Sequence, residues 1–166
     1  MASQFGDILR VLVQHRVRFV IVGGVAGAIH GSSRATYDID LVYDRKRDNV
    51  ERLVSALQPL DPYLRDAPPD LPFRFDVQTV LSGLNFTLTT SLGALDLFGE
   101  TVGGATYTRL VKHSDEVEVS GVRCLCVDIE RLIEMKRASG RPRDFDAIAE
   151  LKAILDARLR GGQTKK

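Results

Sequence analysis

Apolar residues recur along this chain with two different periods, and the two periods separate the expected helices from the expected strands. Between residues 3 and 15 the apolar positions recur every three to four residues, which predicts an amphipathic helix. Residues 46–58 carry a similar stripe and predict a second helix. Two more helices are expected near the C terminus, over 128–138 with Asp128 as the N-cap and over 143–159.

The strands are predicted from β-branched runs and from alternation with a period of two. Residues 17–22 form a short apolar run that is typical of a buried strand, and 37–43 alternate between Asp and apolar residues. Two hairpins are expected, each with a turn between alternating segments. Their strands are FTLTT and ALDLFG in the first hairpin, and EVEV and VRCLCV in the second.

This order of elements predicts an α+β fold, with a small mixed β-sheet flanked by helices and a C-terminal helical segment. We expect an α/β core over residues 1–127, a helical segment over 128–160 that packs on the core, and a disordered tail over 161–166. Five of the six prolines lie in 59–72, which predicts an irregular loop. That loop is either a plain connector or the border of a cleft.

A glycine pair and three aspartates carry the candidate chemistry. Gly23 and Gly24 lie between an expected strand and a short helix, where a backbone without side chains can approach a phosphate at a helix N-terminus. After thirteen intervening residues, Asp38 and Asp40 share one face of a strand, and two parallel carboxylates repel unless a cation lies between them. Asp96 faces away from its apolar neighbours and completes the site if its strand lies beside 37–43. Such a site fits Mg²⁺ or Mn²⁺, with Asp96 accepting a proton from a nucleophile.

Charge and composition narrow the function classes. The 23 Lys and Arg residues nearly balance the 22 Asp and Glu residues, so a general attraction for DNA or an anionic membrane is not expected. Cys124 and Cys126 are expected to be reduced apolar residues on one strand face. With neither a secretory signal nor an apolar run of membrane length in the sequence, we expect a cytoplasmic protein that makes no membrane contact.

These residues resemble the nucleotidyltransferase superfamily that includes polymerase beta and the minimal nucleotidyltransferases. Val22-Gly23-Gly24, Asp38-Ile39-Asp40-Leu41 and Asp96 match the pattern of that family. The string VGGVAGAIHGSSRATYDIDLV is similar to a small bacterial subgroup related to abortive-infection nucleotidyl transferase toxins, as are LNFTLTTSLGALDLFGETVGGATY and LIEMKRASGRPRDFDAI. The resemblance covers residues 17–155.

The resemblance also suggests residues that would bind the phosphates. Lys136 either extends its amine to solvent or meets a triphosphate, and the resemblance to the toxins, which are expected to use a lysine of this region in the second way, leaves both interpretations open. Arg34 either contacts phosphate, neutralises the Asp pair before metal binds, or forms a structural salt bridge. Many members carry Ser at the position of Gly24, which leaves Ser33 or its neighbour Ser32 as the replacement hydroxyl. Asp144 either interacts with the helix dipole or orients Lys136 or Arg34.

The expected function is metal-dependent transfer of a nucleotidyl group from a nucleoside triphosphate to a hydroxyl. The acceptor is left open among a tRNA, a protein and a small molecule, and a toxin role would bring a cognate antitoxin as partner. The alternative is a catalytically silent module of the same fold, which binds a nucleotide or another protein.

Overall fold

The structure, a computed structural model, describes residues 2–163 and the side chains of 5–162, and a mixed sheet organises it. The strand order is β3-β4-β5-β2-β1-β7-β6. β1 is antiparallel to β2, while β2 is parallel to β5, so β2 lies inside the sheet. The strands are β1 (Phe19–Val22), β2 (Asp38–Tyr43), β3 (Tyr63–Leu64), β4 (Asn85–Thr90), β5 (Gly93–Phe98), β6 (Ser114–Val119) and β7 (Val122–Val127).

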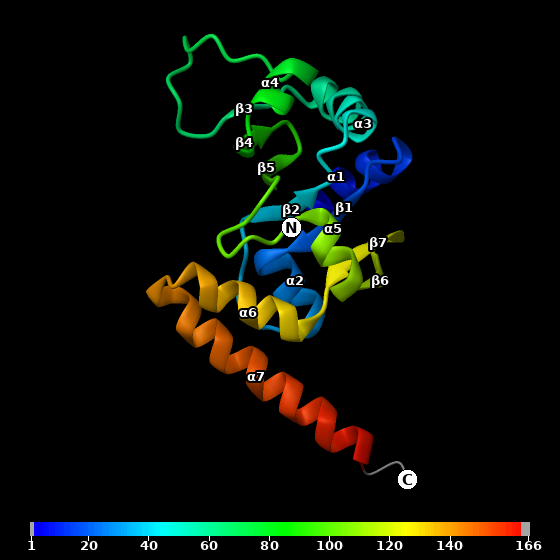
Figure 1. The fold of residues 1–166 in the computed structure, drawn as a ribbon, viewed down its shortest axis with the longest axis vertical. Helices are drawn as coiled ribbons and strands as arrows, with labels where there is room; N and C mark the ends of the chain where they lie inside the picture. Colours follow the sequence, from blue (N-terminus) through cyan, green and yellow to red (C-terminus); the bar gives the residue numbers. More distant parts are fainter. Residues whose placement is uncertain (1, 164–166) are drawn as a thin grey trace.

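Helices cover both faces of this sheet (Figure 1). On one side α1 contacts α3 and β7, and on the other α2 contacts β2, α6 and α7. The helices are α1 (Ala2–Gln14), α2 (Gly23–His30), α3 (Arg47–Leu57), α4 (Val77–Ser82), α5 (Tyr107–Leu110), α6 (Ile129–Ser139) and α7 (Pro142–Gln163). Two 3₁₀ turns, η1 (Gln58–Leu60) and η2 (Val111–His113), follow α3 and α5.

The alternation along β2 divides the core from the functional face. Ile39 and Leu41 are fully buried, whereas Asp38 and Asp40, which alternate with them, are partly exposed. The same division holds on β5, where Leu95 and Leu97 are buried on either side of Asp96. Burial of the apolar side chains therefore fixes the register of both strands, because a slip of one residue would turn those side chains toward water.

The predicted α+β class is confirmed, and the structure adds short elements that the sequence patterns did not predict. β3 lies within the proline-rich segment, and α4 and α5 have only six and four residues. Helices this short hold too few turns for a visible apolar period. The local signal for α4 is its N-cap, where the Asp76 carboxylate accepts a hydrogen bond from Thr79 N at 2.8 Å.

The ends of the chain and the cysteines can be compared with their predictions. The expected tail, 161–166, is helical as far as Gln163, and 164–166 lie outside the described residues. Cys124 and Cys126 are free thiols on β7, and burial raises their pKa values to about 11 and about 12. Among residues 2–163, every helix is too short or too polar to cross a bilayer.

Candidate active site

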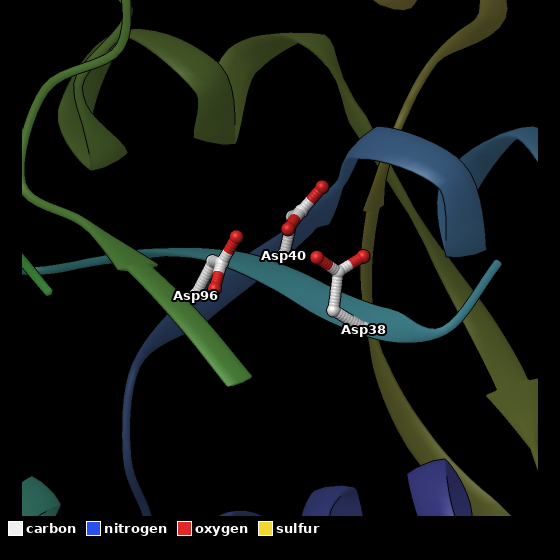
Figure 2. A group of neighbouring side chains, drawn as sticks. All are labelled: Asp38, Asp40 and Asp96. Carbon is white, nitrogen blue, oxygen red and sulfur yellow. The ribbon is translucent and has the colours of Figure 1, made fainter. Parts of the chain in front are cut away.

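Three carboxylates from two neighbouring strands lie together on one face of the sheet (Figure 2). The parallel pairing of β2 with β5 sets Asp40 opposite Asp96, and Asp38 lies two residues before Asp40 on the same face. One carboxylate oxygen from each residue lies within 4.8 Å of the oxygens from the other two. The structure therefore brings together the three aspartates that the sequence singled out.

The glycine pair lies directly against this cluster. Gly23 begins α2 with a φ of 68°, a conformation that favours glycine. A Cβ at this position would lie 2.0 Å from Asp40 Oδ2, so only a residue without a side chain leaves room for that carboxylate. A Cβ on Gly24 would lie 2.8 Å from Thr36 Oγ1. The pair thus permits a close approach of α2 to β2, and both glycines line the cavity above the carboxylates.

The carboxylates influence one another electrostatically. Burial, followed by the charges of Asp38 and Asp96, raises the pKa of Asp40 to about 7. Burial also raises the pKa of Asp96, against the opposing effect of the Arg65 charge. Clustered carboxylates that resist ionisation favour a hard divalent cation, which oxygen ligands suit best. The donor set of this site therefore fits a hard divalent cation.

Asp38, Asp40 and Asp96 form an acidic triad, and Arg65, which follows β3, contacts two of its members. The sequence patterns did not indicate this contact. Arg65 Nη2 donates to Asp96 Oδ1 at 2.7 Å and to Leu88 O at 2.8 Å. Its Nη1 lies 3.5 Å from Asp38 Oδ2. A signal was present in the sequence, because Arg65 is the only Lys or Arg within the proline-rich segment 59–72. The contact places Arg65 beside the three carboxylates, while the residues that line the cavity come from other segments than 59–72.

Cationic side chains line the same cavity as the carboxylates. The cavity has a volume of about 360 Å³, and its cationic residues come from the turn before β2 and from the junction of α6 with α7. They are Arg34, Lys136, Arg141 and Arg143. Burial lowers the pKa of Lys136, while the charge of Asp144 opposes that shift. Acidic and basic groups therefore line one cavity together.

Asp144 organises this basic side and is itself 4% exposed. Its Oδ2 accepts hydrogen bonds from Ser139 Oγ at 2.8 Å and from Arg141 Nε at 2.9 Å. Lys136 Nζ lies 3.7 Å from Asp144 Oδ1. Although burial acts to raise the pKa of Asp144, the hydrogen bonds from Ser139 and Arg141 outweigh it and lower that pKa. Asp144 therefore stays ionised and holds both cations near the cavity.

Ser33 is oriented differently from the other candidate phosphate ligands. Its N–H donates to Glu150 Oε1 at 2.7 Å, and its hydroxyl donates to the same atom at 3.1 Å. Ser32 Oγ donates to Glu150 Oε2 at 3.1 Å, and Ser32 lines the cavity. The structure thus ties Ser33 to α7 rather than turning it toward the carboxylates, and Ser32 is the hydroxyl nearer to the cavity.

Comparisons with known proteins add evidence about the fold. No protein-family model matches the sequence, and no curated protein matches it. Solved structures do match. One is the lincosamide antibiotic adenylyltransferase LnuA with lincomycin bound, at 15% identity and a TM-score of 0.63; the match covers 93% of this chain and 98% of that one.

A second match is the antibiotic-resistance factor ANT(2'')-Ia, at 14% identity and a TM-score of 0.57, which covers 98% of this chain and 95% of that one. The same protein in complex with adenylyl-2''-tobramycin matches with a TM-score of 0.52 at 14% identity, over 96% of this chain and 97% of that one. At such low identity the likeness concerns the fold, and it extends over nearly the whole chain. The protein therefore has the nucleotidyltransferase fold that its sequence predicted.

Proposed function

We propose that this protein is a metal-dependent nucleotidyltransferase, which moves a nucleotidyl group from a nucleoside triphosphate to a hydroxyl and releases pyrophosphate. The observation that carries the proposal is the acidic cluster of Asp38, Asp40 and Asp96, which lines one cavity together with basic side chains. Two-metal phosphoryl-type transfer needs oxygen ligands on one side and compensation of the phosphate charge on the other.

Each group has a distinct part in this proposal. Asp38, Asp40 and Asp96 hold Mg²⁺ or Mn²⁺, which supplies charge stabilisation for the attacking and leaving oxygens. The acceptor oxygen bonds to the α-phosphorus, the bond from that phosphorus to the bridging oxygen breaks, and pyrophosphate leaves. The Asp96 carboxylate accepts the proton of the acceptor hydroxyl, a role that suits a carboxyl group whose pKa is raised by burial.

The phosphate chain is bound on the other side of the cavity. Gly23 and Gly24 offer backbone N–H groups at the start of α2, where the partial positive charge of the helix favours an anion. Lys136 and Arg34 add full positive charges, and Asp144 positions Lys136. Ser33 contributes only if its bonds to Glu150 break.

The structural neighbours favour a small-molecule acceptor over a tRNA or a protein. LnuA is an adenylyltransferase that acts on lincosamide antibiotics, and ANT(2'')-Ia was solved with adenylyl-2''-tobramycin. These names support an adenylyl donor and a hydroxyl on a small polar molecule. The near-balance of charges supports the same choice over a large RNA footprint. A toxin role with a cognate antitoxin is the competing version, in which the labelled product is a tRNA or a protein.

A labelling experiment tests the proposal and separates the acceptors. The chain is incubated with each α-³²P-labelled nucleoside triphosphate and Mg²⁺ or Mn²⁺, with lincosamides and aminoglycosides, total tRNA or a protein extract as acceptor. Transfer is expected to a small molecule with release of pyrophosphate. Asp38→Asn and Asp40→Asn should lower the rate by about 1,000-fold, since each removes charge that is organised for the transition state.

The exposed Asp115 on β6 provides the matched control. Asp115→Asn removes the same charge outside the cavity and should leave transfer unchanged. Label on tRNA or protein would contradict the small-molecule acceptor and support the toxin role. Binding of a triphosphate without transfer to any acceptor would contradict the proposed activity and leave a silent nucleotide-binding module.

A further inference from the structure

A single guanidinium, that of Arg65, lies against two of the three carboxylates that would hold the proposed cation. The backbone N–H of Arg65 donates to Thr87 O at 2.9 Å, which anchors the residue beside β4. From this anchor the side chain extends to β5 and β2, where it contacts Asp96 at 2.7 Å and Asp38 at 3.5 Å. Arg65 therefore bridges two of the carboxylates that a metal ion would need.

The Arg65 guanidinium and a divalent cation would compete for the same carboxylates. One guanidinium carries one positive charge, whereas the cluster offers three carboxylates. A divalent cation brings twice that charge and uses the same carboxylates as ligands. A guanidinium and a divalent cation repel each other when they share ligands only a few ångströms apart. Occupation by the one therefore weakens occupation by the other.

The bridging position of Arg65 also leaves a polar group without a partner. Its Nε–H is buried and has no hydrogen-bond acceptor among the described residues. A buried donor without an acceptor destabilises the position that buries it, and it regains a partner when it reaches water. The Arg65 side chain is 21% exposed, so it already borders solvent. Rotation of the side chain away from the triad would hydrate Nε while the backbone bond to Thr87 remains.

We infer that Arg65 is an internal counterion of the acidic triad, which a divalent cation must displace. It stabilises the cluster while no metal is bound, and it lowers the affinity of the cluster for the metal. The inference rests on the proposed function in one respect, namely that the triad binds a divalent cation. The competing interpretation is a fixed support, in which Arg65 orients Asp96 for the metal and its removal weakens binding.

Binding of Mn²⁺ to the full chain distinguishes these two roles without a measurement of activity. The electron paramagnetic resonance signal of free Mn²⁺ gives the dissociation constant for the wild type and for Arg65→Gln. Displacement predicts that Arg65→Gln binds Mn²⁺ roughly tenfold more tightly, a size typical of coupling between two binding events. Arg74→Gln is the matched control, because Arg74 is exposed in the same connection between β3 and α4 and lies outside the cavity. Its affinity for Mn²⁺ should equal that of the wild type.

Thermal unfolding supplies a second measurement. In EDTA, Arg65→Gln should unfold at a lower temperature than the wild type, because the carboxylates have lost their counterion. Added Mn²⁺ should raise the Tm of Arg65→Gln by more than it raises the Tm of the wild type. If Arg65→Gln does not fold in EDTA, Arg65→Lys takes its place, because it keeps one charge but lacks the two-nitrogen bridge. Arg65→Lys should bind Mn²⁺ more tightly than the wild type, by a smaller factor than the one predicted for Arg65→Gln. Unchanged or weaker Mn²⁺ binding in the variants, with normal binding by the wild type, overturns the inference and leaves the proposed function standing. No Mn²⁺ binding by any of these proteins contradicts both.

Discussion

The two sides of the cavity hold their charges by different means. On the acidic side, Asp40 and Asp96 are set opposite each other by backbone pairing between β2 and β5, and short side chains leave little freedom. On the basic side, Lys136 and Arg141 reach the cavity on long side chains from a helix and from the junction after it, held by Asp144. The proposed metal ligands are therefore organised before binding, whereas the basic side chains can adapt to the proposed phosphate chain.

The largest effect is expected from a substitution of Gly23, which lies against Asp40 on the acidic side of the cavity. Gly23→Ala would place a Cβ 2.0 Å from Asp40 Oδ2 and would impose a φ of 68° on a residue with a side chain. Because β2 is paired on both sides, the Asp40 side chain must move. We expect transfer to fall by roughly 100-fold, as is typical for displaced catalytic groups, and the free energy of unfolding to fall by about 2–3 kcal/mol.

Gly121 provides the control for backbone strain alone. It has a φ of 78° in the β6–β7 turn, and a Cβ there would meet nothing within 4 Å. Gly121→Ala should therefore lose only the strain contribution, about 1 kcal/mol, and should keep full transfer activity. Urea unfolding and transfer assays on both variants give the comparison. Equal loss of activity in both would show that the contact with Asp40 is unimportant.

A smaller effect is expected on the basic side. Lys136→Met removes a charge from the cavity but leaves Arg141 and Arg34 in place. We expect the KM for the triphosphate to rise by about tenfold, with a smaller change in kcat, because one point charge among several contributes mainly to binding. Arg137→Met, at the exposed neighbouring position on α6, should leave the KM unchanged. A loss confined to kcat would assign Lys136 to the chemical step instead.

The smallest expected effect is a pH dependence that belongs to the acidic side. The pKa of Asp40 is about 7 in the metal-free folded protein and about 3.9 in an unfolded chain. The folded state therefore binds more protons than the unfolded state between these values, and stability falls as pH rises from about 5 to 7. We expect a loss of about 1 kcal/mol or more over this interval in EDTA.

Asp40→Asn removes the titrating group and should flatten that profile. Thermal unfolding of both proteins in EDTA, at half-unit steps from pH 5 to pH 8, measures the difference. Mn²⁺ should also flatten the wild-type profile, because a bound cation stabilises the ionised carboxylate. A wild-type stability that rises with pH across this interval would contradict the assignment of a raised pKa to Asp40.

The sequence predicted the site best where a local pattern decides the geometry. Alternation along β2 places Asp38 and Asp40 on one face, and alternation along β5 does the same for Asp96. The sequence did not establish that these strands are neighbours, because pairing between residues so far apart in the chain depends on the whole sheet. The Arg65 contact was missed for the same reason, since it comes from an irregular segment whose path no periodic pattern records.

The bonds from Glu150 to Ser32 and Ser33 have a mechanical consequence. They fasten α7 to the segment 31–36, which carries Arg34 and Thr36 into the cavity. Thr36 in turn lies against Gly24 at the start of α2. A displacement of α7 would therefore move the segment 31–36 and, with it, the part of the cavity wall that Arg34 and Thr36 form. A change made far along the last helix can thus alter the shape of the proposed nucleotide site, without touching any of the side chains that line it.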